Sequence, residues 1–250
     1  MRKIFSILLL SSFLAQNSFT DDLAFNTFNN HGVIGLINMP TARLYNESSY
    51  GFTLYVGEPD QKITMTSNPF NWLEASFFYT NIKGKPYCNV DYDPVCGQDY
   101  KDKGFNLKIR LKEEGIWPAI AVGINDIAGT GLYSSEYIVA SYGVNKTDFH
   151  FGLGWGQLNG SKKNFKNPLG KIDDSFYERP QYSADNGGQF QPSRYFSGET
   201  ASPFFGITHA LNENYLLKLE YDTTLTPGEV GYELAKQDFS LGLDFNITKN

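Results

Sequence analysis

The sequence predicts an all-β protein, and specifically an antiparallel transmembrane β-barrel of about 10–12 strands or part of a larger barrel. Apolar and polar residues alternate in five segments, and clusters of Gly, Pro, Asn and Asp separate these segments as turns would. The 39 aromatic residues (Tyr 16, Phe 20, Trp 3) would supply the girdles that barrels place at both membrane interfaces. Because the half-buried strands of a soluble β-sandwich also alternate, a sandwich remains the alternative fold.

The clearest alternation lies in residues 105–112. The apolar set is Phe105, Leu107, Ile109 and Leu111, and the polar set is Asn106, Lys108, Arg110 and Lys112. Successive side chains of a strand point to opposite faces, so this period of two excludes a helix packed on a core. In a barrel we expect the apolar set to face lipid and the polar set to face the lumen.

The same alternation returns in residues 72–81, 148–156, 215–222 and 239–247. In 148–156 the apolar side chains stand opposite His150 and three glycines, which leaves room inside. These apolar side chains are Phe149, Phe151, Leu153 and Trp155. Weaker strand candidates are 50–57, 61–67, 118–126, 135–143 and 203–210. Together these segments give about ten strands and no helix.

The N-terminus has the form of a secretory signal peptide. Arg2 and Lys3 precede an apolar run from Ile4 to Leu14, and no cysteine follows this run to accept a lipid. The run is too short for a spanning helix. We therefore expect a signal peptide over residues 1–20 and a barrel domain over 21–250, which could be the N-terminal part of a longer protein.

The charge of the chain excludes one class of partner. Without the signal peptide, 19 basic residues face 27 acidic ones, a net charge of −8. A nucleic-acid partner is not expected for such an acidic protein.

Cys88 and Cys96, the two cysteines, lie in a turn-rich stretch between two predicted strands. In an exported protein they are expected to form a disulfide. Because no histidine lies nearby to complete a metal site, we expect no metal there, and no motif implies a cofactor.

Common enzyme motifs are absent: there is no GxSxG elbow, HExxH motif or phosphate-binding glycine loop. His150 shares the polar face of its strand with Asp148, so a triad like those of barrel hydrolases is the alternative to a lumen-lining histidine. Residues 157–198 lack periodicity and would form a long extracellular or lumen-filling loop.

Four long segments carry a family resemblance: GVIGLINMPTARL (32–44), QDYKDKGFNLKIRL (98–111), PAIAVGINDIAGTGLYSSEYIVAS (118–141) and FHFGLGWGQLNG (149–160). With several shorter segments, they resemble the YjbH family of outer-membrane β-barrel proteins of exopolysaccharide or capsule biosynthesis and export. The resemblance implies a non-enzymatic protein of the Gram-negative outer membrane. Polysaccharide, outer-membrane lipid and other products of a polysaccharide operon would be its partners.

The polar strand faces would line the lumen in this interpretation and offer mixed charge to a hydroxylated sugar. The residues expected there are Glu74, Lys108, Arg110, Lys112, His150, Lys218 and Glu220. A barrel enzyme acting on lipid or polysaccharide, and a periplasmic carbohydrate-binding sandwich, are the alternatives.

Oxidation of the cysteine pair is directly testable. Mass spectrometry of the purified protein should find Cys88 and Cys96 linked, because the signal peptide directs them to an oxidising compartment. The double change to serine should still fold, since closing so short a loop contributes at most about 2.6 kcal/mol. Two thiols that alkylate without prior reduction would refute the disulfide.

Overall fold

The computed structural model describes residues 26–88, 97–181, 188, 190–227, 232–234 and 238–247. Its regular elements are β-strands and short 3-10 helices, which confirms the all-β class. Across the described ranges, no helix has the length and apolar character needed to cross a membrane.

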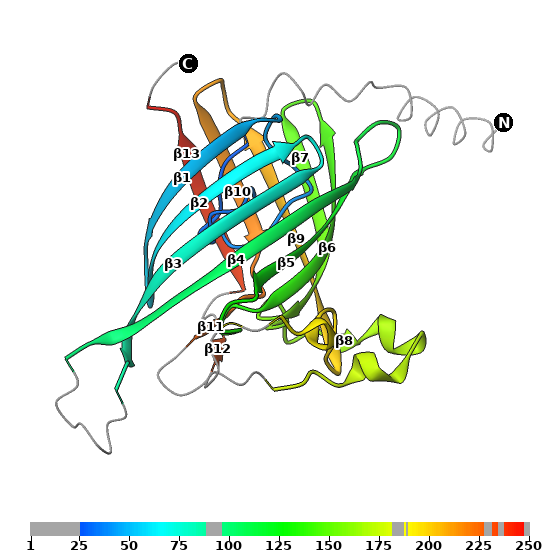
Figure 1. The fold of residues 1–250 in the computed structure, drawn as a ribbon. Coiled ribbons are helices and arrows are strands. Elements are labelled where there is room, and N and C mark those ends of the chain that lie inside the picture. The colour runs from blue at the N-terminus through cyan, green and yellow to red at the C-terminus, as the bar shows by residue number, and fades with distance from the viewer. Residues whose placement is uncertain are drawn as a thin grey trace.

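Ten antiparallel strands, arranged in chain order, form the main sheet (Figure 1). They are β1 (Ser49–Val56), β2 (Asp60–Phe70), β3 (Leu73–Pro86), β4 (Asp99–Lys112), β5 (Ala119–Ile127), β6 (Ser135–Val144), β7 (Thr147–Gly156), β9 (Thr200–Ala210), β10 (Tyr215–Tyr221) and β13 (Phe239–Phe245). Each predicted strand segment coincides with one of them. The short β8 (Phe165–Lys166) pairs with β9 as an eleventh strand, and β11 (Leu225–Pro227) pairs with β12 (Tyr232–Leu234). One large sheet is therefore present, not the two stacked sheets of a sandwich.

The sheet is strongly curved, with β1 and β13 as its edges. Within the described ranges no pairing joins these two strands, so the predicted continuous ring is not seen there. Both edge strands nevertheless lie close to residues 28–37, which are on the concave side of the sheet. A Cβ atom added to Gly51 of β1 would meet Phe28, and one added to Gly242 of β13 would meet Ile37.

The two faces of the sheet have the reverse polarity of a water-soluble protein. Large apolar side chains stand exposed on the convex face, as with Phe52 (66 % exposed), Phe151 (58 %) and Leu241 (73 %). Charged and hydroxyl side chains are buried on the concave face, including Lys108 (1 %) and Glu220 (0 %). The predicted alternation of β4 is confirmed, with Phe105 and Leu111 exposed and Lys108 buried.

The two ends of the sheet differ in their connections. One end, the short-turn end, has connections of two to six residues: 71–72, 113–118, 145–146 and 211–214. The other, the long-loop end, carries 57–59, 87–98, 128–134, 157–199 and 222–238. The chain enters β1 and leaves β13 at the short-turn end, at the top of Figure 1.

Residues 157–199 form the longest connection at the long-loop end. Its described residues include three 3-10 helices that the sequence did not predict: η1 (Pro168–Lys171), η2 (Asp174–Tyr177) and η4 (Pro192–Arg194). Arg179 anchors this loop, because its guanidinium binds the buried Glu136 carboxylate at 2.7 and 3.0 Å. Phe196 packs edge-on against Trp155 with ring centroids 5.3 Å apart, which buries a tryptophan expected on the exposed face.

Candidate functional site

Residues 26–45, the internal segment, lie on the concave side of the sheet. They form irregular turns without a helix or strand, held by two isolated β-bridges, Phe28 with Ile34 and Gly35 with Pro40. The Asn29 side chain stabilises the first turn by accepting hydrogen bonds from the backbone of His31 (2.9 Å) and Val33 (3.2 Å). The concave side is therefore occupied by the chain itself.

Charged side chains of β10 hold the backbone of the internal segment. The Glu220 carboxylate accepts hydrogen bonds from the N–H groups of three successive residues, at 2.9–3.1 Å: Ile37, Asn38 and Met39. Lys218 donates to the Leu36 carbonyl oxygen at 2.7 Å and also pairs with Asp244 of β13 at 2.7 Å. Since these bonds go to backbone atoms, they constrain the path of the segment rather than its side chains.

A second ion pair holds the segment from β3 and β4. Lys108 Nζ lies 3.0 Å from Glu74 Oε1, and both side chains are almost fully buried. Lys108 also donates to the Ile34 carbonyl at 2.9 Å, while Glu74 accepts from the Ile34 N–H at 3.2 Å. Together the pair satisfies both backbone polar groups of one buried residue.

Apolar side chains of the segment pack against β5 and β6. Leu36, Met39 and Ala42 join inward residues of these strands in the main apolar cluster; the strand residues are Ala119, Ala121, Tyr137 and Val139. Gly206 of β9 permits the close approach, because a Cβ atom there would lie 2.3 Å from Leu36. The interior thus has an apolar side and a charged side, and the internal segment matches both.

Of the residues predicted to line the lumen, five lie buried on the concave face: Glu74, Lys108, His150, Lys218 and Glu220. Arg110 and Lys112 do not join them, because they lie where β4 ends. Arg110 donates to the Asn71 carbonyl and pairs with Glu113, and Lys112 is exposed beside Trp117.

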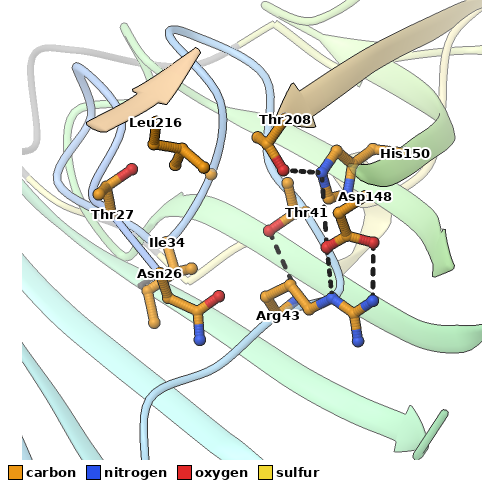
Figure 2. A pocket seen from close by; sticks show the side chains of 10 residues that line it. Asn26, Thr27, Ile34, Thr41, Arg43, Asp148, His150, Thr208 and Leu216 are labelled. Carbon is orange, nitrogen blue, oxygen red and sulfur yellow. Dashed lines mark hydrogen bonds and ion pairs between the residues drawn. The ribbon is translucent and has the colours of Figure 1, made fainter. Parts of the chain in front are cut away.

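His150 lies between a serine and a carboxylate, the arrangement that the enzyme alternative requires. Figure 2 shows His150 beside Asp148, with Arg43 on the other side of that carboxylate. The Nδ1 atom of His150 is 2.8 Å from Ser141 Oγ, and its Nε2 atom is 3.7 Å from Asp148 Oδ2. Ser141 Oγ also accepts a hydrogen bond from the Ala42 N–H at 2.9 Å. Both oxygens of Asp148 bind the Arg43 guanidinium at 2.7 Å.

These contacts leave little space for a substrate beside His150. The cavity beside His150 and Arg43 measures about 20 Å³, enough for about one water molecule. Ser141 is fully buried beneath the internal segment. In this structure Ser141, His150 and Asp148 pack against the internal segment and help to fix it. A lipid or a sugar has no access to them.

Arg43 is the cation that links the end of the internal segment to the sheet. It pairs with Glu114 as well as with Asp148. Burial alone would lower the pKa of Arg43, but the hydrogen bonds and charges of Asp148 and Glu114 outweigh burial and raise that pKa above its ordinary value. Arg43 therefore carries its positive charge at neutral pH, as arginine side chains do.

Sequence reasoning missed the whole internal segment, and with it Arg43 and Ser141. Segment 32–44 was distinctive only as a family resemblance, because it has no periodicity. The described residues contain no cluster of three or more side chains suited to a metal ion. Cys96 lies outside the described residues, so the disulfide stays a prediction.

The fold and site define an antiparallel β-sheet protein with an apolar outer face and a charged interior filled by its own N-terminal segment. The profile of the YjbH family, described as "Exopolysaccharide biosynthesis protein YbjH", matches residues 27–250. An Escherichia coli (strain K12) protein named "Uncharacterized lipoprotein YjbH" is 37 % identical over 221 residues. That alignment covers 87 % of this chain and 31 % of the relative, so the chain spans about a third of the relative's length. No solved structure matches. The chain belongs to the YjbH family.

The hold of Glu220 on the internal segment can be tested by proteolysis. Glu220→Ala should raise the rate of tryptic cleavage after Arg43 about tenfold or more, because it leaves buried N–H groups without acceptors, each costing about 1–3 kcal/mol. Glu213→Ala, in an exposed turn, is the matched control and should cleave as the wild type does. Equal cleavage in both variants would contradict the role given to Glu220.

Proposed function

We propose that the protein is a non-enzymatic outer-membrane β-barrel that takes part in exopolysaccharide or capsule biosynthesis or export. The observation that carries the membrane assignment is the inverted polarity of the sheet. A continuous apolar convex face with a charged concave face costs free energy in water but suits a barrel surrounded by lipid.

The connections support the same assignment. Bacterial outer-membrane barrels have an even number of antiparallel strands, short periplasmic turns and longer extracellular loops. The ten strands of the main sheet follow this scheme, and the chain enters and leaves it at the short-turn end. In this proposal β1 and β13 close the ring, the short-turn end faces the periplasm and residues 157–199 lie outside the cell.

Family membership supports the biological role. The family description names exopolysaccharide biosynthesis, and the E. coli relative is named a lipoprotein, which fits an exported protein associated with a membrane. Polysaccharide, outer-membrane lipid and the other products of a polysaccharide operon are the partners we propose. Because the internal segment fills the interior, passage of a sugar chain would require that segment to move aside.

The membrane assignment predicts an unusual response to an exposed substitution. Phe151, in the middle of β7, is 58 % exposed. In a soluble protein, Phe151→Arg would change stability by less than about 0.5 kcal/mol. In a barrel it should cost roughly 2–4 kcal/mol and lower the amount of folded protein in outer-membrane fractions.

Ile172→Arg is the control for that experiment. Ile172 is 78 % exposed but lies in the long loop, outside the strands, so its substitution should leave membrane assembly unchanged. Equal tolerance of both arginines would contradict a lipid-facing β7.

A barrel enzyme is the second candidate, favoured by the contact of Ser141 and Asp148 with His150. One experiment distinguishes the enzyme from the non-enzymatic barrel. Deleting the gene should lower surface or secreted polysaccharide, and complementation with His150→Ala or Ser141→Ala should restore it. Loss of output in both variants with normal membrane assembly would favour the enzyme, because removing a triad member costs several orders of magnitude in rate.

A further inference from the structure

The internal segment bridges the two edge strands of the sheet. On β1 the ring of Phe28 covers Gly51, where a Cβ atom would lie 2.3 Å from that ring. On β13 Ile37 covers Gly242, and its Cγ1 atom is 3.0 Å from the position of a Cβ atom there. Within the described ranges β1 and β13 do not pair with each other. One short stretch of chain therefore links two strands that are not linked by a ladder.

Strand β2 holds the first turn of the segment through uncharged side chains. Thr64 Oγ1 donates to the His31 carbonyl oxygen at 3.4 Å, and Thr66 Oγ1 donates to the Gly32 carbonyl oxygen. Gly32 has a φ of 76°, and a Cβ atom there would lie 2.3 Å from Thr64. With the contacts described above, β2, β3, β4, β6, β7 and β10 all form hydrogen bonds or ion pairs with the segment.

The apolar side chains of the segment are as deeply buried as those of a domain core. Those that are at most 2 % exposed are Val33, Ile34, Leu36, Met39 and Ala42. Parts of a protein that open readily have few buried apolar contacts and have backbone hydrogen bonds open to solvent. The internal segment has the opposite character. Its departure would expose the main apolar cluster to water and would leave buried charged groups without partners.

We propose that the internal segment is a permanent core that joins β1 to β13, and that no polysaccharide chain passes through the interior of this barrel. The inference rests on the proposed function and narrows it, because the part played in biosynthesis or export is then accessory and is not conduction. The cavity beside Arg43 and His150 agrees, since its volume of about 20 Å³ admits about one water molecule and no sugar residue.

A disulfide between the segment and β13 provides the test. Ile37→Cys with Gly242→Cys, the locked variant, suits this purpose. Because Ile37 Cγ1 is one bond beyond Cβ and lies 3.0 Å from the Cβ position at Gly242, the two Cβ atoms fall within the ~4.5 Å that a disulfide spans. The pair is made in a chain that carries Cys88→Ser and Cys96→Ser, so no other cysteine competes. Gly242→Cys alone in the same chain is the matched control.

Hydrogen exchange of the purified full chain in detergent, read by mass spectrometry, tests whether the segment is permanent. Peptides that cover residues 34–42 should exchange as slowly as those of β6, and the disulfide should change their rate by less than about twofold. A segment that leaves the interior would exchange about tenfold faster than β6 or more, and the disulfide would slow it. That result would overturn the proposal.

Complementation of a gene deletion tests whether the interior conducts. The locked variant should restore surface or secreted polysaccharide to the level of the matched control. Loss of output in the locked variant alone, with normal membrane assembly, would show that passage needs the segment to move and would overturn the proposal. If the deletion itself leaves polysaccharide unchanged, the proposed function is wrong, and hydrogen exchange still decides whether the segment is a permanent core.

Discussion

The structure depends on one constraint: the backbone of the internal segment is buried inside a curved sheet and must still be hydrogen-bonded. A buried N–H or carbonyl group without a partner costs about 1–3 kcal/mol. Residues 34–39 form no strand ladder there, so charged side chains take its place, chiefly Glu220, Lys218 and the Lys108–Glu74 pair. A buried ion pair adds little net stability compared with apolar residues of similar volume, but loss of one partner is strongly destabilising. These pairs fix the path of a segment that has no regular structure of its own.

This constraint also accounts for the inverted sheet. The inward charged side chains can be buried because they form hydrogen bonds with the internal segment and ion pairs with one another. The large apolar side chains of the strands then stand on the convex face. In water such a face would favour aggregation, whereas in a membrane it supplies the contact with lipid. The interior of this protein is consequently a filled space, and its two sides, one charged and one apolar, match the two sides of the internal segment.

All ten main strands could be predicted from the sequence, because alternation with a period of two is a local signal. Phe105 to Lys112 carry the pattern of β4 without any knowledge of its neighbours. The inward orientation of Lys108, Lys218 and Glu220 could be predicted as well, but neither their burial nor their partners could. Those partners are backbone atoms of residues 34–39, up to 183 positions away in the chain, in a segment with no periodicity. Trp155 was misassigned to the open face for a similar reason, since Phe196, from a loop without periodicity, covers it.

The proposed closure of β1 onto β13 around the internal segment is the central claim, and electrophoresis of outer-membrane fractions tests it most directly. A closed barrel resists unfolding by detergent until it is heated. Outer-membrane fractions kept unheated in dodecyl sulfate should therefore give a band that migrates differently from the boiled sample. Identical migration of the unheated and boiled samples would contradict the account, because an open sheet with an apolar convex face would unfold in the detergent at once.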